Sequence, residues 1–181
     1  MHTMSEAIAT YTEAEYLVIE QRSEVRHEFV GGRLYQMSGG TERHELAVGA
    51  IVRRLHAGAR AARCRTFANR QLRVPSGDHF YPDVMAACGK ASHVLYEERP
   101  TLIVEVLSPT TAAEDRKGKL RAYATCETLD RYGLVDPVFR RFEVYRQKTW
   151  SSFGPGDVVE TGYGVISVDE FYDELDAEAT T

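Results

Sequence analysis

The stretch ThrLeuIleValGluValLeuSerProThrThr, residues 101–111, places one charged side chain, Glu105, inside an otherwise continuous β-favouring run. Runs of this kind form strands that are buried on both faces of a sheet, where an isolated charge is costly. Glu105 therefore needs a strong partner. Two kinds of partner are considered: an arginine or lysine in an ion pair, and a metal ion shared with a second carboxylate.

A second carboxylate, Asp83, opens another hydrophobic segment, Asp83–Cys88. Two carboxylates that are brought together repel each other unless one is protonated or a cation lies between them. A divalent cation held by Asp83 and Glu105 is therefore an alternative to a simple ion pair. These two residues alone leave both interpretations open.

The residues after Glu105, SerProThrThr at 108–111, end the strand and predict the cap of a helix. Asp115, Lys119 and Tyr123 follow at intervals of four residues and share one face of that helix. The lysine can point back toward Glu105 and bring an ammonium group to the carboxylates, which together are the groups that phosphodiester hydrolysis requires. An ordinary Asp115–Lys119 pair on a solvated helix face is the alternative.

Further segments complete a pattern along the chain. In order they are HisGluPheValGlyGlyArgLeuTyr (27–35), His44 at the start of a helix, TyrProAspValMetAla (81–86), ArgProThrLeuIleValGluValLeuSerProThrThr (99–111), AspArgLysGlyLysLeuArgAlaTyr (115–123) and TyrGlyLeuValAspPro (132–137). Their order and spacing resemble the Uma-two family, which is grouped with the endonucleases of the restriction-endonuclease-like, PD-(D/E)XK superfamily. The resemblance covers roughly residues 12–172.

The resemblance implies an α/β (α+β) fold: a restriction-endonuclease-like mixed β-sheet flanked by helices, with an N-terminal helix and hairpin. It makes Asp83 and Glu105 the metal-binding carboxylates, Lys119 the active-site lysine and Glu28 an additional acidic member. The commoner superfamily pattern places its lysine at the position of Leu107. Lys119 must therefore serve from the following helix, as is usual for this family.

Lys117 is the competing lysine. It lies about 200° around an α-helix from Lys119, so the two cannot both face the site. Lys119 shares its face with Asp115 and Tyr123, and we therefore expect Lys119 to be the active-site residue.

The resemblance further implies hydrolysis of DNA phosphodiester bonds by a water that Mg²⁺ or Mn²⁺ activates. Asp83, Glu105 and the main-chain carbonyl of Val106 are the expected ligands, because these hard cations prefer oxygen. Lys119 would orient the water or neutralise charge on the phosphate. Glu28 is expected to hold an outer-shell water or a second metal, or else to be a solvated residue of the hairpin.

Length and composition indicate one enzyme-sized domain. The chain has 181 residues, of which 43% are hydrophobic, enough for one sizeable core and too few to argue for two. We expect a single domain over residues 12–175, with flexible tails at 1–11 and 176–181.

Neither a membrane span nor a secretion signal is found in the sequence. No apolar stretch approaches the roughly 20 residues that a span requires, and the first residues lack a basic start and an apolar centre. A cytoplasmic protein is expected.

Cys64, Cys88 and Cys126 show no paired spacing, so we interpret them as small buried hydrophobes.

Capping signals, hydrophobic periodicity and turn residues predict the order of the elements. Helices are expected at about residues 12–22, 41–61 and 112–126, with an amphipathic helix at 168–175. A hairpin is expected at 26–35, and strands at 65–68, 71–74, 83–88, 102–107, 132–135 and 142–146. The segment SerSerPheGlyProGlyAsp at 151–157 predicts a turn.

Charge gives mixed information about DNA as a partner. The net charge of −5 offers no general attraction to phosphates. Residues 46–77, however, contain several arginines and no acidic residue, whereas acidic residues crowd the end of the chain. A basic face with an acidic tail is expected, with Arg53, Arg54 and Arg70 as candidate DNA contacts; His44 is a candidate phosphate contact. Pairing of the arginines with acids elsewhere is the alternative.

Three functions follow from these observations. The first is a Mg²⁺-dependent DNA endonuclease, for which a homodimer is suggested by the need of a duplex-cutting enzyme to address two strands. The second is a catalytically inactive nuclease-fold module that binds DNA or another protein. The third is a structural dimer partner, with apolar surface around residues 163–171 and with carboxylates that are merely ion-paired.

Overall fold

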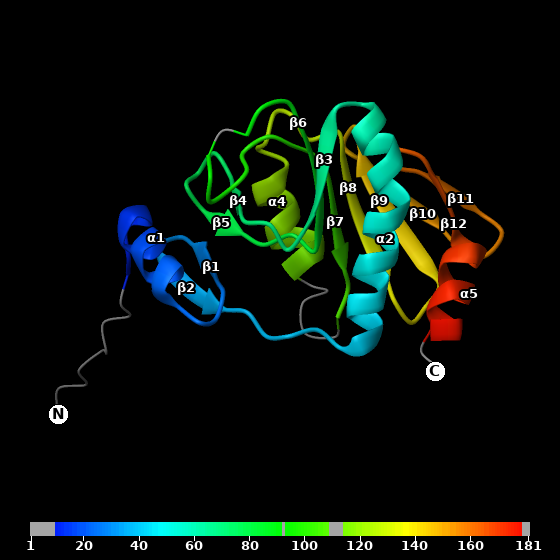
Figure 1. The fold of residues 1–181 in the computed structure, drawn as a ribbon, viewed down its shortest axis with the longest axis horizontal. Helices are drawn as coiled ribbons and strands as arrows, with labels where there is room; N and C mark the ends of the chain where they lie inside the picture. The colour runs from blue at the N-terminus through cyan, green and yellow to red at the C-terminus, as the bar shows by residue number, and fades with distance from the viewer. Residues whose placement is uncertain (1–9, 92, 109–113, 179–181) are drawn as a thin grey trace.

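The computed structural model describes residues 10–91, 93–108 and 114–178. Figure 1 shows its elements, which are α1 (Glu13–Arg22), β1 (His27–Val30), β2 (Arg33–Gln36), α2 (Glu42–Ala61), β3 (Cys64–Ala68), β4 (Leu72–Arg73), β5 (His79–Phe80), β6 (Val84–Cys88), β7 (Pro100–Val106), the π-helix η1 (Asp115–Lys119), α4 (Leu120–Tyr123), β8 (Arg131–Asp136), β9 (Arg141–Arg146), β10 (Thr149–Phe153), β11 (Val158–Glu160), β12 (Val165–Ser167) and α5 (Val168–Glu178).

The central sheet has six strands in the order β10-β9-β8-β7-β6-β3. β7 and β8 are parallel, with Glu105 beside Leu134, and the other neighbouring strands are antiparallel. A parallel pair needs a crossover connection, and η1 and α4 lie on that connection. The sheet is therefore mixed, as the sequence predicted.

Both faces of the sheet are covered, which agrees with the continuous apolar run around Glu105. On one face α2 and α5 pack over β7 side chains such as Val104 and Val106, and Figure 1 shows α2 lying along the sheet with α5 beside it. On the other face α4 packs over Ile103 and Leu107. Successive strand residues alternate between the two faces, so Glu105 points to the α4 face.

A second, four-stranded sheet has the order β2-β1-β5-β4 and contains the N-terminal hairpin. In the hairpin Glu28 is paired with Tyr35 and the turn is formed by Gly31 and Gly32, both with positive φ. The hairpin joins the rest of the protein through the pair Phe29 and His79. This connection carries Glu28 toward the main sheet.

Some predicted boundaries were wrong. The helix expected over 112–126 begins, within the described residues, with π-helical winding at Asp115–Lys119 and ends at Tyr123. Residues 151–153, expected in a turn, belong to β10, and β11 and β12 were missed. β11 and β12 have three residues each, which is too short for an alternation of hydrophobic and polar residues to be recognised in the sequence.

Several expectations fall on other parts of the chain. The predicted helix cap at 109–111 lies outside the described residues, as do residues 1–9 and 179–181 of the expected tails. Residues 176–178 belong to α5. Within the described residues, no helix combines the length and the apolar character needed to cross a bilayer.

The interpretation of all three cysteines as buried hydrophobes was wrong for two of them. Cys64 and Cys88 are directly opposite each other in the β3–β6 pair and form a disulfide. Cys126 is free and buried. Because the two bonded residues are 24 positions apart, only the pairing of strands brings their sulfur atoms together.

Candidate active site

Asp83 and Glu105 lie on neighbouring antiparallel strands. The pair Val84–Val104, continued by one residue, sets Asp83 opposite Glu105, and side chains of directly opposed residues lie on the same face. The Asp83 N–H donates to Glu105 Oε2 at 3.2 Å, and the Val106 N–H donates to Asp83 Oδ2 at 2.8 Å. Main-chain hydrogen bonds thus fix both carboxylates where their charges repel.

Glu105 is almost fully buried, with 2% of its surface exposed. Its Oε1 accepts a hydrogen bond from the Tyr123 hydroxyl at 2.8 Å and lies 3.2 Å from the Lys119 Nζ. Burial raises the pKa of Glu105 well above its ordinary value, and Asp83 and Asp115 add to this rise against the opposing effect of Lys119. The site therefore holds more negative charge than its lysine compensates.

Lys119 reaches this site from η1, the π-helical turn. Its Nζ lies 3.2 Å from Asp115 Oδ1 and 3.4 Å from Glu28 Oε1, in addition to Glu105. Burial opposes its charge, but the surrounding carboxylates outweigh burial and raise the pKa of Lys119. Lys119 is therefore held as a cation, while Lys117 is exposed.

The π-helix belongs to the geometry of the site. Segments of this kind are rare and occur mostly as single turns near functional sites. Asp115, at the start of η1, is 1% exposed, and its carbonyl accepts a hydrogen bond from the Tyr132 hydroxyl at 2.9 Å. This bond ties η1 to the sheet and keeps Asp115 and Lys119 over Glu105.

His44, predicted as a phosphate contact, contacts the carboxylate of Asp83 in the structure. Its Nε2 lies 3.3 Å from Asp83 Oδ2, and Glu45 lies on its other side. The hydrogen bond to Asp83 raises the pKa of His44, against the effect of burial. His44 enters from the first turn of α2, which Thr41 caps. The start of α2 thus braces one of the two opposed carboxylates.

These residues line one large cleft. Its volume is about 1220 Å³, and its walls include Glu28, His44, Asp83, Glu105 and Lys119, together with main-chain atoms around Val106. The hairpin forms one wall, and the turn between β8 and β9 lies at another side. The structure therefore brings six of the predicted site residues together.

The remaining predicted DNA contacts lie elsewhere. Arg53 and Arg54 both pair with Glu174 of α5, and the Arg70 side chain donates to the Val94 carbonyl at 2.7 Å. None of the three lines the cleft. The acidic end of the chain, expected apart from the basic face, folds back as α5 and neutralises part of it. A nucleic-acid role for these arginines stays a prediction.

The sequence interpretation undervalued two groups. Tyr123 was given no role beyond sharing a helix face with Lys119, yet its hydroxyl is one of the two donors to Glu105 Oε1. Asp115 was considered as a surface partner of Lys119 and is buried beside it. The four-residue spacing of Asp115, Lys119 and Tyr123 was the signal that could have found both.

The oxygen atoms of this cluster are suited in part to a divalent cation. In the part of the chain that the structure describes, no three His, Cys, Asp or Glu side chains are arranged to hold an ion by themselves. Glu28 Oε1 and Asp115 Oδ1 are buried and lack a hydrogen bond within those residues, although each lies within ion-pair distance of Lys119. Oxygen donors in excess of positive charge fit a hard cation, and Mg²⁺ binds through one or two carboxylates while keeping several waters.

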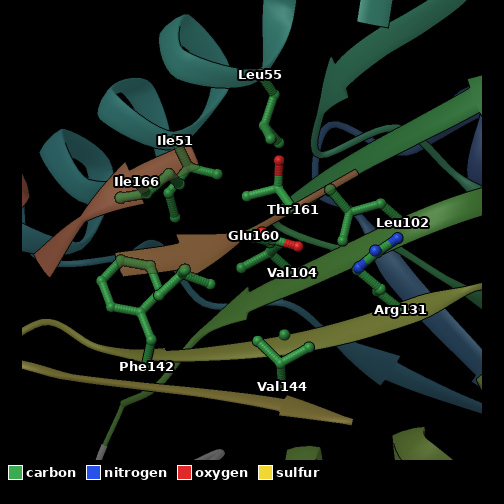
Figure 2. Close-up of a pocket in the computed structure, with 12 residues that line it drawn as sticks. Ile51, Leu55, Leu102, Val104, Arg131, Phe142, Val144, Glu160, Thr161 and Ile166 are labelled. Carbon is green, nitrogen blue, oxygen red and sulfur yellow. The ribbon is translucent and has the colours of Figure 1, made fainter. Parts of the chain in front are cut away.

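A second cavity is small and apolar. It measures about 20 Å³, and Figure 2 shows Ile51 and Leu55 of α2 pointing into it opposite Leu102 and Val104 of β7. Val104 and Glu105 point to opposite faces of the sheet. The cavity therefore belongs to the packing of α2 and is not part of the carboxylate cluster.

Two proteins of Synechocystis sp. resemble this chain over most of their length. The uncharacterized protein slr1290 of Synechocystis sp. is 29% identical over 151 residues, which are 81% of this chain and 79% of that protein. The uncharacterized protein sll1609 of the same organism is 30% identical over 142 residues, covering 75% of this chain and 80% of the relative.

A solved structure and a family model agree with the predicted fold and family. The crystal structure of "a putative nuclease belonging to DUF820" from Anabaena variabilis matches this chain with a TM-score of 0.76 at 18% identity, and the match covers 91% of this chain and 98% of that one. This likeness confirms the predicted fold. The model of the Uma2 family, described as "Putative restriction endonuclease", matches residues 13–163. The chain therefore belongs to the Uma2 family.

Proposed function

We propose that this protein is a Mg²⁺- or Mn²⁺-dependent endonuclease that hydrolyses phosphodiester bonds of DNA. One observation carries the proposal: Asp83 and Glu105 are fixed opposite each other, with the Lys119 ammonium at 3.2 Å from Glu105 Oε1. Such a buried concentration of carboxylates is unfavourable without a cation. Membership of a family described as restriction endonucleases supports this assignment.

The residues have separate tasks in this proposal. Asp83, Glu105 and the main-chain carbonyl of Val106 would hold the ion. When bound, a divalent cation supplies positive charge that acidifies a water and stabilises negative charge developing on the phosphate. Lys119, which lies within ion-pair distance of three carboxylates, would exchange one of these partners to orient the water or to neutralise a non-bridging phosphate oxygen.

Other side chains keep the acids in place. The Tyr123 hydroxyl holds Glu105 Oε1, and His44 together with the Val106 N–H holds Asp83 Oδ2. Glu28 binds an outer-shell water or shares Lys119 with Glu105. These contacts leave little rotational freedom, which positions reacting groups before the substrate arrives.

The test does not require the natural substrate. Isothermal titration with Mg²⁺ and Mn²⁺, followed by calorimetric unfolding, is carried out on the parent, on Glu105→Gln and on Glu160→Gln, an exposed acid on β11. A ligand that binds only the folded protein raises its unfolding temperature. We expect binding and stabilisation in the parent and in Glu160→Gln, and their loss in Glu105→Gln. Equal metal responses in all three proteins would sink the proposal.

The second candidate is a nuclease fold that binds DNA without cutting it. The close engagement of Lys119 by three carboxylates favours this alternative, because a lysine occupied in this way has fewer donors for a substrate. It predicts that Asp83→Asn binds DNA as well as the parent does, and that neither protein produces cleavage products with Mg²⁺ or Mn²⁺. Nicking by the parent alone favours the enzyme.

A further inference from the structure

Exposed hydrophobic side chains form part of the lining of the cleft. Of the nine large hydrophobic residues that are well exposed in the described part of the chain, four line this cleft: Val25, Tyr35, Val138 and Phe139. Phe139 is 73% exposed and Val138 is 64% exposed. Both belong to the turn between β8 and β9, whereas Tyr35 belongs to the N-terminal hairpin.

The turn that carries Phe139 is firmly held. Asp136 Oδ1 accepts the N–H groups of Val138 and Phe139, each at 2.9 Å. The Arg43 Nε donates to the Pro137 carbonyl at 2.6 Å. Arg140, next to Phe139, pairs with Asp173 and Asp176 of α5. These contacts fix the backbone of the turn, and the side chains of Val138 and Phe139 remain exposed to solvent.

The charges around the cleft give little attraction for a phosphate backbone. Among its described lining residues, three are cationic and seven are acidic. The three cations already have partners: Lys119 contacts carboxylates, Arg43 contacts Pro137 and Asp176, and Arg26 donates to the Asn69 carbonyl. Proteins that bind duplex or single-stranded DNA both depend on phosphate contacts by Lys and Arg. This cleft needs another source of affinity.

A phenyl ring supplies a specific kind of affinity. It has no donor or acceptor for the edge of a paired base, but it stacks on the face of an unpaired one. In regular duplex DNA the base faces are hidden by their neighbours. A phenylalanine in the same cleft as the proposed phosphodiester-cleaving residues therefore suits a strand whose bases are exposed.

We infer that Phe139, with Val138 beside it, stacks on an unpaired base next to the scissile phosphate, so that the substrate class is single-stranded or locally opened DNA. This inference rests on the proposed function, because it assigns the substrate of the same cleft. Tyr35 of the hairpin, which also lines the cleft, offers a second ring for a base.

The test is fluorescence anisotropy with the full chain and three labelled probes: a single-stranded oligonucleotide, the same sequence as a duplex, and that duplex with unpaired bases. Ca²⁺ is added, since it takes oxygen ligands like those proposed here for Mg²⁺. The variants are Phe139→Ala, Phe139→Leu and Val138→Ala. Val165→Ala is the matched control, because Val165 is also 64% exposed and lies on β12, away from the cleft.

We expect the parent to bind the single-stranded and opened probes more tightly than the duplex. Phe139→Ala should weaken binding of both by about tenfold or more, the range for losing one base stack. Phe139→Leu should lose most of that affinity, since it keeps apolar bulk without a ring. Val165→Ala should bind as the parent does.

Three results would overturn the inference. One is unchanged binding of the single-stranded probe by Phe139→Ala. A second is tighter binding of the regular duplex. A third is a change in sedimentation by Phe139→Ala with no change in DNA binding, which would make the turn a protein contact. If the parent binds none of the probes but keeps its metal response, this inference fails while the metal-site proposal stands; if the metal response is absent as well, both fail.

Discussion

Asp83 and Glu105 face each other across the antiparallel pair of β6 and β7, and each carboxylate accepts a main-chain N–H from the other strand. The hydrogen bonds hold together two groups whose charges repel. Glu105 is buried, and its pKa is raised chiefly by that burial, with Asp83 adding to the rise. Placing two like charges together lowers the stability of the fold, so their function is not to stabilise it. A bound cation would offset their repulsion, as the proposed function requires.

Removing one charge from this pair should reveal the repulsion. Without added metal, we expect Glu105→Gln to raise the free energy of unfolding by up to about 1 kcal/mol, the scale of cross-strand pairs. Asp83→Asn should have a similar effect, and the double variant should gain less than the sum, because one substitution already removes the repulsion. Urea denaturation at neutral pH in the presence of a chelator measures the free energy of unfolding of the parent, the two single variants and the double variant. Strict additivity would contradict the proposed coupling.

Lys119 should be far more important for stability than Lys117, two positions away. Lys119→Met leaves a buried carboxylate without its cation, and such losses cost about 3–5 kcal/mol. Lys117→Met, at an exposed position, should change stability by no more than about 0.5 kcal/mol. Chemical denaturation compares the two variants.

A rescue experiment separates charge from packing at the same place. Adding Glu105→Gln to Lys119→Met should recover much of the lost stability, because the uncompensated charge is removed. If the double variant remains as unstable as Lys119→Met, the loss arises from packing of the lysine stem instead.

Two glycines of α2 should respond oppositely to alanine. A Cβ on Gly58 would lie 1.7 Å from the Tyr163 carbonyl oxygen, so the helix and the chain at Tyr163 must move apart. Gly58→Ala should therefore cost about 1–3 kcal/mol. A Cβ on Gly49 would make only an ordinary contact, with Arg53 at 3.6 Å, and Gly49→Ala should gain up to about 1 kcal/mol from helix propensity. Thermal unfolding tests the difference in sign.

The disulfide predicts a redox-dependent stability. Joining Cys64 to Cys88 restricts the unfolded chain, and disulfides of this kind contribute about 2–4 kcal/mol. A reductant should lower the unfolding temperature of the parent and leave the Cys64→Ser/Cys88→Ser variant unchanged. Thiol titration of the denatured, unreduced protein should find one free thiol, Cys126. Three thiols would show that the bond does not form in solution.

Glu13 should make stability depend on pH in the acid range. Its hydrogen bond with Arg73, assisted by His79 and opposed by burial, lowers the pKa of Glu13 from 4.5 to about 2. The native state thus favours the ionised form of Glu13. Its contribution to the free energy of unfolding is therefore complete above pH 4.5 and disappears as the pH falls toward 2. Glu13→Gln should therefore be less stable than the parent at neutral pH, with a gap that narrows between these limits.

Urea denaturation across that range measures the gap. Glu24→Gln, at an exposed position after α1, is the control and should run parallel to the parent. A gap between the parent and Glu13→Gln that stays constant down to about pH 2 would show that the carboxylate charge is not the cause.

The sequence by itself determined the central strands and the main helix. The predicted helix at 41–61 matches α2, and the run around Glu105 matches β7, because hydrophobic periodicity and capping are local properties. The shared four-residue spacing of Asp115 and Lys119 survives even in the π-helical turn. A charge within a buried strand was enough to mark where the carboxylates and Lys119 come together.

Only the tertiary structure decided which partners each charged group has. Arg54 meets Glu174 across 120 positions, and Lys119 meets Glu28 of a hairpin in another sheet. The Cys64–Cys88 bond likewise depends on strand register. These contacts form because packing of the whole chain brings distant segments together, and interactions over such separations leave no periodic signal in the sequence.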